Sequence, residues 1–178
     1  MNRRSLLRSL GTLIALPLLP SCSRATEAET APAAAAGASA IVPLNKPHEE
    51  WRGLVSAAAY AVLFNEDTER AGSSPLNDEK RVGTYVCAAC YLPQFNSAAK
   101  FESGTGWPSF TQPIEGHVAT SKDYKLVWPR TEYHCARCGG HQGHVFDDGP
   151  KPRGERWCNN GVALVFVPES QALPALRG

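Results

Sequence analysis

Two cysteine pairs with identical spacing constrain the fold of this chain more than any other feature of its sequence. Cys87-Ala88-Ala89-Cys90 and Cys135-Ala136-Arg137-Cys138 each place two thiols within one tight turn. Two such pairs can close a single tetrahedral site of four thiolates, which leaves Zn²⁺ without an open coordination position. We therefore predict one structural Zn²⁺ per chain. The 44 residues between the pairs exceed the usual zinc-ribbon insert, so we expect a β-sheet between them.

The alternative for the paired cysteines is a set of disulfides, but CxxC bridges are strained and easily reduced. His134 and His141 flank the second pair, and four sulfurs already complete the tetrahedron without them. A zinc site of this kind leaves Cys158 free to react. Arg156 lies two residues before it, and a nearby guanidinium lowers the pKa of a thiol. A buried, inert cysteine is the other interpretation of Cys158.

The first 22 residues are predicted to be an export signal. Asn2-Arg3-Arg4-Ser5-Leu6-Leu7-Arg8 carries three positive charges before a short apolar stretch, Leu10 to Pro20. That stretch is too short to span a membrane, and the paired arginines resemble a twin-arginine signal. Leu19-Pro20-Ser21-Cys22 resembles a bacterial lipobox, in which Cys22 would be lipidated and tether the chain to a membrane; cleavage after Ala25 is the rival. We therefore expect an exported, periplasmic protein, either anchored or free.

Composition indicates one globular domain with extensions. Residues 23–47 are rich in Ala, Thr and Glu and lack bulky side chains, so we predict a flexible tether. We expect a catalytic domain over residues 48–170 and a C-terminal tail over 171–178. The net charge of the chain is +1, and subtracting the three arginines of the export signal leaves −2 for the remainder. Since a basic stripe is absent from this sequence, nucleic acid is not an expected partner.

The pattern after the tether predicts helices followed by short strands. Residues 48–66 have a helical pattern in which Ser56 can cap the second stretch. From Thr84 onward, short segments are bounded by Gly, Pro, Asn and Asp, which is typical of strands and turns. We predict strands at 85–86, 126–128 and 162–167, the last at the centre of a sheet because it is apolar on both faces. The expected fold is mainly β (α+β), with small antiparallel sheets behind N-terminal helices.

Two further segments carry residues suited to catalysis. His141 and His144 would face apart on a regular strand, so the neighbouring glycines are expected to let them converge. Next to Cys158, they would supply a proton donor for a nucleophile, whereas alone they would be a metal pair or polar surface. Trp107, between Gly106 and Pro108, is predicted to line a dry pocket suited to a methyl sulfur substituent; an indole that fills the core is the alternative.

The region from about Trp51 to Pro168 resembles the B-type peptide-methionine (R)-S-oxide reductases. Five motifs carry the resemblance in the order of that family: Thr84 to Cys90, Lys100 to Phe110, Arg130 to Glu132, His134 to Pro150 and Glu155 to Asn160. The resemblance implies a β-tent of two sheets, with zinc bound by Cys87, Cys90, Cys135 and Cys138. It also implies thiol-dependent reduction of methionine-R-sulfoxide in oxidised proteins or peptides, as a repair of oxidative damage.

The resemblance assigns roles to the residues around the free cysteine. Cys158 would attack the sulfoxide sulfur and become a sulfenic acid. His144, with help from His141 and Asn160, would hydrogen-bond and protonate the departing oxygen. Arg156 would favour the thiolate form of Cys158.

The same resemblance implies substrate contacts and a reductant. Trp107 would form the wall against the substrate methyl group, with Phe146 near it. Many relatives carry a second, resolving cysteine where this chain has Thr105, so we expect a thioredoxin-like protein or a small thiol to reduce Cys158 directly. A zinc-ribbon binding module and a CxxC thiol–disulfide oxidoreductase are the competing interpretations. We expect a monomer.

Overall fold

The computed structural model describes residues 41–178. The predicted export signal with Cys22, and most of the predicted tether, lie outside these residues. Within residues 41–178, no helix combines the length and apolar character that crossing a membrane requires.

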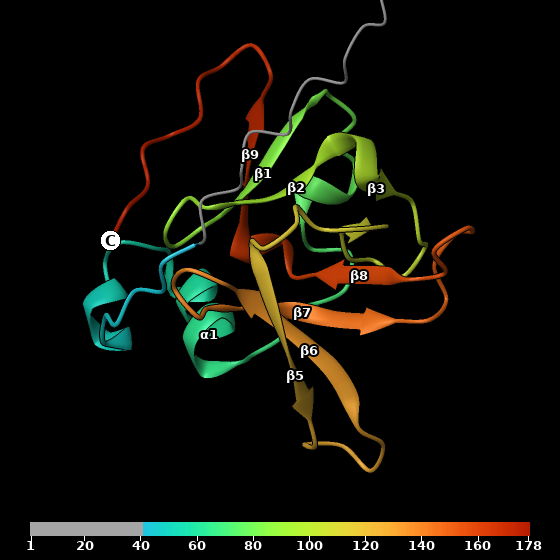
Figure 1. Cartoon of the computed structure of the whole chain (residues 1–178), viewed down its shortest axis with the longest axis horizontal. Coiled ribbons are helices and arrows are strands. Elements are labelled where there is room, and N and C mark those ends of the chain that lie inside the picture. The colour runs from blue at the N-terminus through green and yellow to red at the C-terminus, as the bar shows by residue number, and fades with distance from the viewer. Residues whose placement is uncertain (1–40) are drawn as a thin grey trace, which may run out of the picture. The chain divides into compact units, whose positions relative to one another are not determined.

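The described chain begins with a 3₁₀ turn, η1 (His48–Trp51), and one short helix, α1 (Ala57–Asn65). Ser56 caps α1 by accepting a hydrogen bond from the Ala59 amide at 3.1 Å, as the sequence predicted. Glu66 ends the helix in the left-handed conformation, with φ 55°. The helix buries Tyr60, Val62 and Leu63 against the cysteine pairs. Figure 1 shows it beside β7, an inner strand of the larger sheet.

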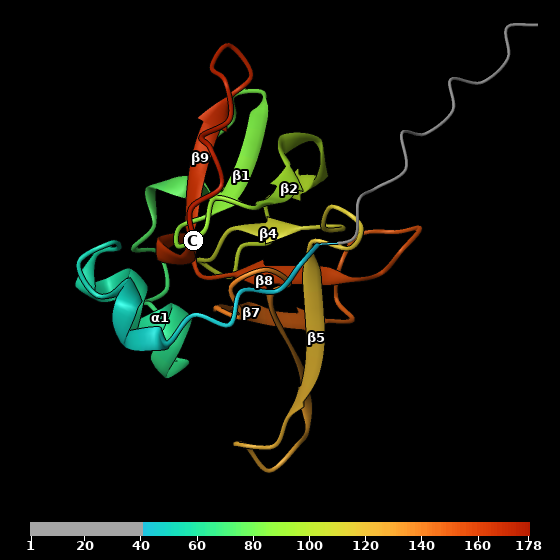
Figure 2. The same cartoon turned by 60° about the vertical axis from the view of Figure 1, so that its left-hand side comes forward.

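Two antiparallel sheets follow, which confirms the predicted fold class (Figures 1 and 2). The smaller sheet has the order β2-β1-β9, and the larger one has the order β3-β4-β8-β7-β6-β5. The bounds of the strands are β1 (Gly83–Cys87), β2 (Pro93–Asn96), β3 (Lys100–Phe101), β4 (Ser109–Phe110), β5 (Val118–Asp123), β6 (Arg130–Cys135), β7 (His141–Phe146), β8 (Arg156–Asn159) and β9 (Leu164–Pro168). The remaining 3₁₀ turns are η2 (Pro75–Asn77), η3 (Ser97–Ala99) and η4 (Gly161–Ala163).

An aromatic core joins the two sheets and fixes the position of β8. Phe95 and Phe110 stack with ring centroids 4.1 Å apart, and Tyr133 meets Trp157 edge to face at 5.0 Å. All four are buried. Such pairs add to the hydrophobic effect of burial. Because Trp157 is held in this core, the next residue of β8, Cys158, is held in place on the opposite face of the strand.

One of the predicted strands is wrong, and another is only partly right. Leu126-Val127-Trp128 is the turn between β5 and β6, and Val127 is 92% exposed. The flanking strands pair in register up to Asp123 and Arg130, so the apolar run between them is left to close the hairpin.

The predicted central strand at 162–167 is also wrong in its place and its start. Its first part is the 3₁₀ turn η4, and β9 begins at Leu164. β9 pairs with β1 alone, at the edge of the smaller sheet, and Val165 is 42% exposed. The apolar run therefore reflects partial burial of an edge strand, in which Leu164 and Val167 are buried and Val165 is exposed, rather than burial on both faces.

Candidate active site

The four paired cysteines meet in one buried cluster, as the spacing predicted. Cys87 ends β1 and Cys135 ends β6, while Cys90 and Cys138 lie in the turns that follow. The Sγ atoms of Cys87 and Cys138 are 3.6 Å apart, those of Cys90 and Cys135 are 3.5 Å apart, and all four lie within 4.8 Å of one another. A tetrahedron with Zn–S bonds of about 2.3 Å has edges of about 3.8 Å. The cluster is therefore consistent with a zinc site.

Two glutamine amides donate to sulfurs of this cluster. Gln94 Nε2 lies 3.5 Å from Cys135 Sγ, and Gln142 Nε2 lies 3.4 Å from Cys87 Sγ. Both glutamines are fully buried. Donors of this kind stabilise thiolates and orient them for a metal. Strands β2 to β6 lie between the two cysteine pairs along the chain, as the length of the intervening segment predicted.

Cys158 lies on β8 between two strands, opposite Ser109 of β4 and His144 of β7. Among residues 41–178 it is the one cysteine outside the cluster. Its side chain opens into a cavity of about 120 Å³. The cavity is lined by residues from five parts of the chain, namely Thr68, Trp107, Arg130, Gly143, His144, Phe146, Cys158, Asn159 and Asn160.

The environment of Cys158 acts on its pKa in two directions. Burial raises the pKa of the Cys158 thiol, while the Arg156 guanidinium and the Thr105 hydroxyl lower it without reversing the shift. Arg156 is held by two hydrogen bonds to Asp148, from Nε at 2.7 Å and from Nη2 at 3.0 Å. The guanidinium also lies 4.3 Å from the ring centroid of Phe146. Arg156 is therefore a fixed positive charge beside a half-buried sulfur.

A β-bulge brings the two histidines together. Tyr133 pairs with Gly143, and the next residue, His134, pairs with His141, so β7 contains one extra residue at Gln142. The bulge turns His141 and His144 to the same side, with ring centroids 5.4 Å apart. Gly143 was predicted to let the two histidines converge, but instead it lets β7 approach β8 closely. A Cβ at this position would lie 1.9 Å from the Cys158 carbonyl oxygen.

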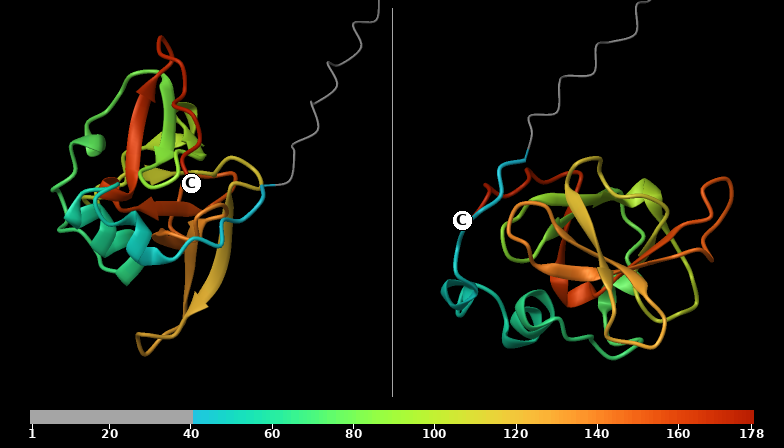
Figure 3. Two further views of the ribbon diagram at one scale, coloured as in Figure 1. Left: turned by 90° about the vertical axis from the view of Figure 1, so that its left-hand side faces the viewer. Right: turned by 60° about the horizontal axis from the view of Figure 1, so that its bottom comes forward.

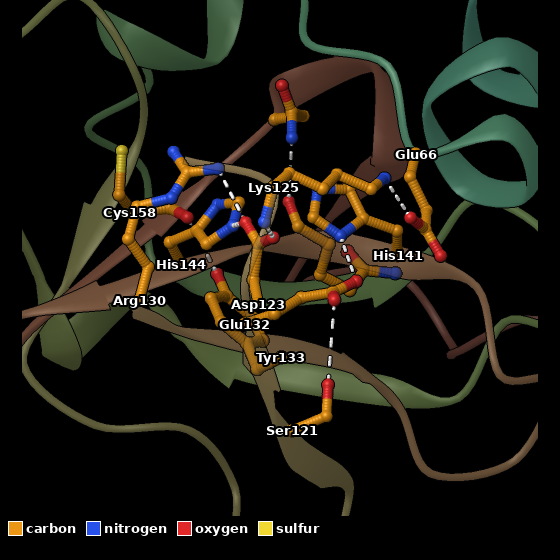
Figure 4. Close-up of polar contacts among 12 residues, drawn as sticks. Glu66, Ser121, Asp123, Lys125, Arg130, Glu132, Tyr133, His141, His144 and Cys158 are labelled. Atoms are coloured by element: carbon orange, nitrogen blue, oxygen red, sulfur yellow. Dashed lines mark hydrogen bonds and ion pairs between the residues drawn. The ribbon is translucent and has the colours of Figure 1, made fainter. Parts of the chain in front are cut away.

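His144 is bound to a carboxylate that the sequence analysis missed (Figure 4). Its Nε2 lies 2.9 Å from Asp123 Oδ2, and Arg130 Nη2 donates to the same oxygen at 2.5 Å. The backbone amide of Lys125, with Arg130 and His144, holds the pKa of Asp123 below its usual range. Burial lowers the pKa of His144, although Asp123 opposes that effect. Asp123 ends β5 and pairs with Arg130, which begins β6, while His144 comes from β7.

His141 lies behind His144 rather than in the cavity. It is 4% exposed, and its Nδ1 lies 2.6 Å from Glu132 Oε1. The cavity lining does not include it. The structure therefore brings His144 to Cys158 and places His141 in a second, deeper pair with Glu132.

A second residue that the sequence analysis missed holds the opposite wall. The Glu69 carbonyl accepts a hydrogen bond from Trp107 Nε1 at 3.2 Å, and the Glu69 amide donates to Asn160 Oδ1 at 3.1 Å. The Glu69 carboxylate accepts from the amides of Gly161 and Val162. Asn160 also donates through Nδ2 to the Gln142 carbonyl at 3.0 Å. One loop residue thus fixes both the indole and the turn after β8.

The cavity combines an accessible thiol, a fixed cation, and an imidazole bound to a carboxylate, which is an arrangement for thiol chemistry with proton transfer.

Comparison with known proteins agrees with this interpretation of the cavity. The SelR domain model matches residues 55–168. A peptide methionine sulfoxide reductase MsrB of Bradyrhizobium diazoefficiens is 50% identical over 125 residues, covering 70% of this chain and 90% of the relative. One of Leptospira interrogans is 46% identical over 127 residues, covering 71% and 97%. The chain belongs to this family, as the sequence motifs indicated.

Proposed function

We propose that this chain reduces methionine-R-sulfoxide in proteins to methionine, with Cys158 as the nucleophile and an external thiol as the reductant. Membership of the family carries the activity itself. The assignment of Cys158 rests on one observation: this sulfur lines the cavity directly opposite His144, whereas the other cysteines of residues 41–178 lie in the buried cluster.

In the first step, Cys158 Sγ attacks the sulfoxide sulfur. The oxygen then migrates from the substrate sulfur to Sγ, so that the substrate S–O bond and the transient bond between the two sulfurs break as the new S–O bond forms. The sulfoxide oxygen is a poor leaving group until it is protonated, and His144 is the acid that lines the same cavity. The substrate sulfur gains two electrons and becomes a thioether. Cys158 loses two electrons and becomes a sulfenic acid, which retains the oxygen.

In the resting site, Cys158 and His144 together hold the one proton that this step uses. Burial raises the pKa of Cys158 and lowers that of His144, so thiol and neutral imidazole is the favoured pair near neutral pH. Transfer of the proton from sulfur to imidazole gives the thiolate and the acid together. Asp123 stabilises the imidazolium that forms, and Arg156 stabilises the thiolate.

Substrate fit and regeneration follow from the lining of the cavity. Trp107 and Phe146 present apolar surface for the methyl group of the substrate. Thr105 contributes a hydroxyl near Cys158, so it cannot form a disulfide with it. Two external thiols, or one dithiol, would then convert the sulfenic acid to the thiol, releasing water and a disulfide.

We assign Zn²⁺ to Cys87, Cys90, Cys135 and Cys138. The four sulfurs fit one tetrahedral ion and would leave it no open position, so the metal would stabilise the fold. Metal analysis of the purified protein tests this assignment, and less than about one zinc per two chains would contradict it.

The proposed reaction is tested with the separated R and S epimers of a blocked methionine sulfoxide in excess dithiothreitol. Wild type should reduce the R epimer alone, and Cys158→Ser should abolish turnover while the protein stays folded. After stoichiometric substrate without reductant, mass spectrometry should find a sulfenic acid at Cys158. Turnover of neither epimer by folded wild type would refute the proposal.

We also propose that the chain acts after export, on the strength of the arginines and apolar stretch in residues 1–22. Cell fractionation and the mass of the mature N-terminus test this. A lipid on Cys22 would indicate an anchored form, and cleavage after Ala25 a free one. An intact N-terminus in the cytoplasmic fraction would contradict export.

A further inference from the structure

An exposed apolar cluster lies at the tip of the β5–β6 hairpin. Four large side chains of residues 124–128 are 58–92% exposed: Tyr124 (73%), Leu126 (58%), Val127 (92%) and Trp128 (80%). Exposed apolar residues that occur singly need no explanation, but a contiguous group marks an interaction site. Figures 1 and 3 show the hairpin extending beyond the rest of the larger sheet.

The tip is connected directly to the active site. Its first stem residue, Asp123, is bound to His144, and its last, Arg130, lines the cavity that holds Cys158. Lys125, within the tip, forms an ion pair with Glu66 at the end of α1 (Figure 4). The tip is therefore anchored at Asp123, Lys125 and Arg130 while its apolar side chains face solvent.

The size of the cavity decides how much of a substrate it can enclose. Its volume of about 120 Å³ is well below the roughly 300 Å³ at which pockets begin to enclose drug-sized ligands. The oxidised side chain fits inside, but the backbone and the neighbouring residues of a polypeptide substrate must lie outside. Arg130 lines the cavity and lies two residues after Trp128, so a chain that leaves the cavity beside Arg130 is within reach of the tip.

We propose that the tip formed by Tyr124, Leu126, Val127 and Trp128 binds apolar residues that flank the oxidised methionine in an unfolded polypeptide. This inference rests on the proposed function and extends it to a substrate class. Methionine sulfoxide disrupts the packing of a protein core, so damaged proteins expose the apolar segments around it. Those segments complement an apolar surface beside the catalytic cysteine.

The charge of the hairpin favours a polypeptide over an anionic membrane. Membrane surfaces attract unpaired Lys and Arg clusters. The three cations of the hairpin, Lys122, Lys125 and Arg130, are balanced by two carboxylates of the hairpin, Asp123 and Glu132, and by Glu66 at the end of α1. Two of the cations, Lys125 and Arg130, are in ion pairs. The tip therefore has apolar contact area without a net positive charge to hold it on lipid.

The test compares three R-sulfoxide substrates: a peptide with Leu and Phe on either side of the oxidised methionine, the same peptide with Ser at both positions, and a blocked single amino acid. In Val127→Ser/Trp128→Ser, KM for the apolar peptide should rise about tenfold, equivalent to ~1.4 kcal/mol, with kcat unchanged. KM for the Ser peptide should change less than about twofold. The control is Val82→Ser, which replaces a 64% exposed valine outside the hairpin. It should leave KM and kcat unchanged for all three substrates.

Several outcomes would overturn the proposal. One is an unchanged KM for the apolar peptide, and another is an equal loss on all three substrates. Binding of wild type to vesicles of anionic phospholipid, lost in the double variant while peptide kinetics stay the same, would assign the tip to membranes instead. Failure of wild type to reduce the blocked amino acid would refute the proposed reaction itself. Reduction of the blocked amino acid with an unchanged KM for the apolar peptide would refute the tip proposal alone.

Discussion

The molecule contains two sulfur sites that use the same atom in opposite ways. In the four-cysteine cluster, every Sγ has other sulfurs within 4.8 Å and the side chains are buried. At the active site, Cys158 is only half buried and faces a cation, a hydroxyl and a cavity. The comparison shows that packing and neighbours, rather than residue type, decide whether a thiol is structural or reactive.

The largest expected effect is on the cluster. Cys135→Ser should lose zinc and cooperative thermal unfolding, because binding of structural zinc contributes about 10 kcal/mol or more to folding. Calorimetry and metal analysis would show the loss, and a strong chelator should unfold wild type in the same way. A sharp thermal transition in the zinc-free protein would show that the cluster is not needed for folding, and the distinction between a structural and a reactive sulfur site would fail.

The next effect separates activity from stability. Cys158→Ser should lower kcat/KM at least about 10⁴-fold, since the nucleophile is removed. Zinc content and Tm should stay near those of wild type, because this sulfur lies outside the cluster. Substantial turnover by the variant would show that another thiol carries the reaction.

Asp123→Asn tests the acid side of the active site. Without the carboxylate, His144 loses the partner that orients it and stabilises its charged form. We expect kcat/KM to fall about 10²-fold. The acid limb of the pH profile should shift to lower pH, because Asp123 raises the pKa of His144. The matched control is Asp147→Asn, an exposed carboxylate on the chain after β7. A uniform loss at all pH values would reduce Asp123 to a structural role.

Arg156→Gln tests the thiol side of the active site. Activity requires one proton shared by Cys158 and His144, so it should fall above the pKa of the thiol and below that of the imidazole. Arg156 lowers the pKa of Cys158, so its removal should move the alkaline limb to higher pH by about one unit. The plateau rate should drop up to about tenfold, because less thiolate forms.

Two companion variants control for packing at this position. Arg156→Lys keeps the charge and should restore much of the alkaline limb, whereas Arg153→Gln removes an exposed arginine and should change nothing. An alkaline limb that stays in place in Arg156→Gln would exclude the electrostatic role.

The sequence predicted the cluster better than the active site, for a physical reason. Metal ligation by Cys87 and Cys90 is a property of local spacing, and one long-range pairing completes it. The partners of His144 depend instead on strand register: Asp123 lies 21 residues away along the chain and reaches His144 only after β5, β6 and β7 are aligned. Glu69 was missed because two of its contacts are made by its backbone, and its carboxylate binds amides 92 and 93 residues away along the chain.

The errors in strand placement have a related cause. Apolar runs predict burial, but Leu126 to Trp128 is exposed because the residues before and after it already complete the pairing of β5 with β6. Local pattern cannot distinguish a buried strand from an apolar turn that serves a partner. The prediction failed at the segment to which the structure assigns substrate binding.

The smallest expected effect tests whether the two sulfur sites are independent. Gln142, the extra residue of the β7 bulge, donates to Cys87 Sγ through Nε2 and accepts from Asn159 Nδ2 at 3.3 Å through Oε1. Its carbonyl accepts from the Asn160 amide at 2.9 Å and from Nδ2 of the same residue. One buried side chain therefore connects the cluster to the strand that carries Cys158.

Gln142→Leu keeps the volume of this side chain and removes both of its hydrogen bonds. We expect a loss of about 1–3 kcal/mol in stability, because Asn159 Nδ2 loses a buried partner. Zinc affinity should fall about tenfold, and kcat/KM a few-fold, since the β8 turn is held less firmly. The control is Gln94→Leu, which removes the equivalent donor to Cys135; the other hydrogen bonds of Gln94 reach carbonyls of Leu92, Pro93 and His117, none of which is on β8. It should weaken zinc binding similarly and leave kcat/KM of the zinc-loaded enzyme unchanged. Equal losses of activity in both variants would show that the cluster acts on Cys158 through the whole fold rather than through Gln142.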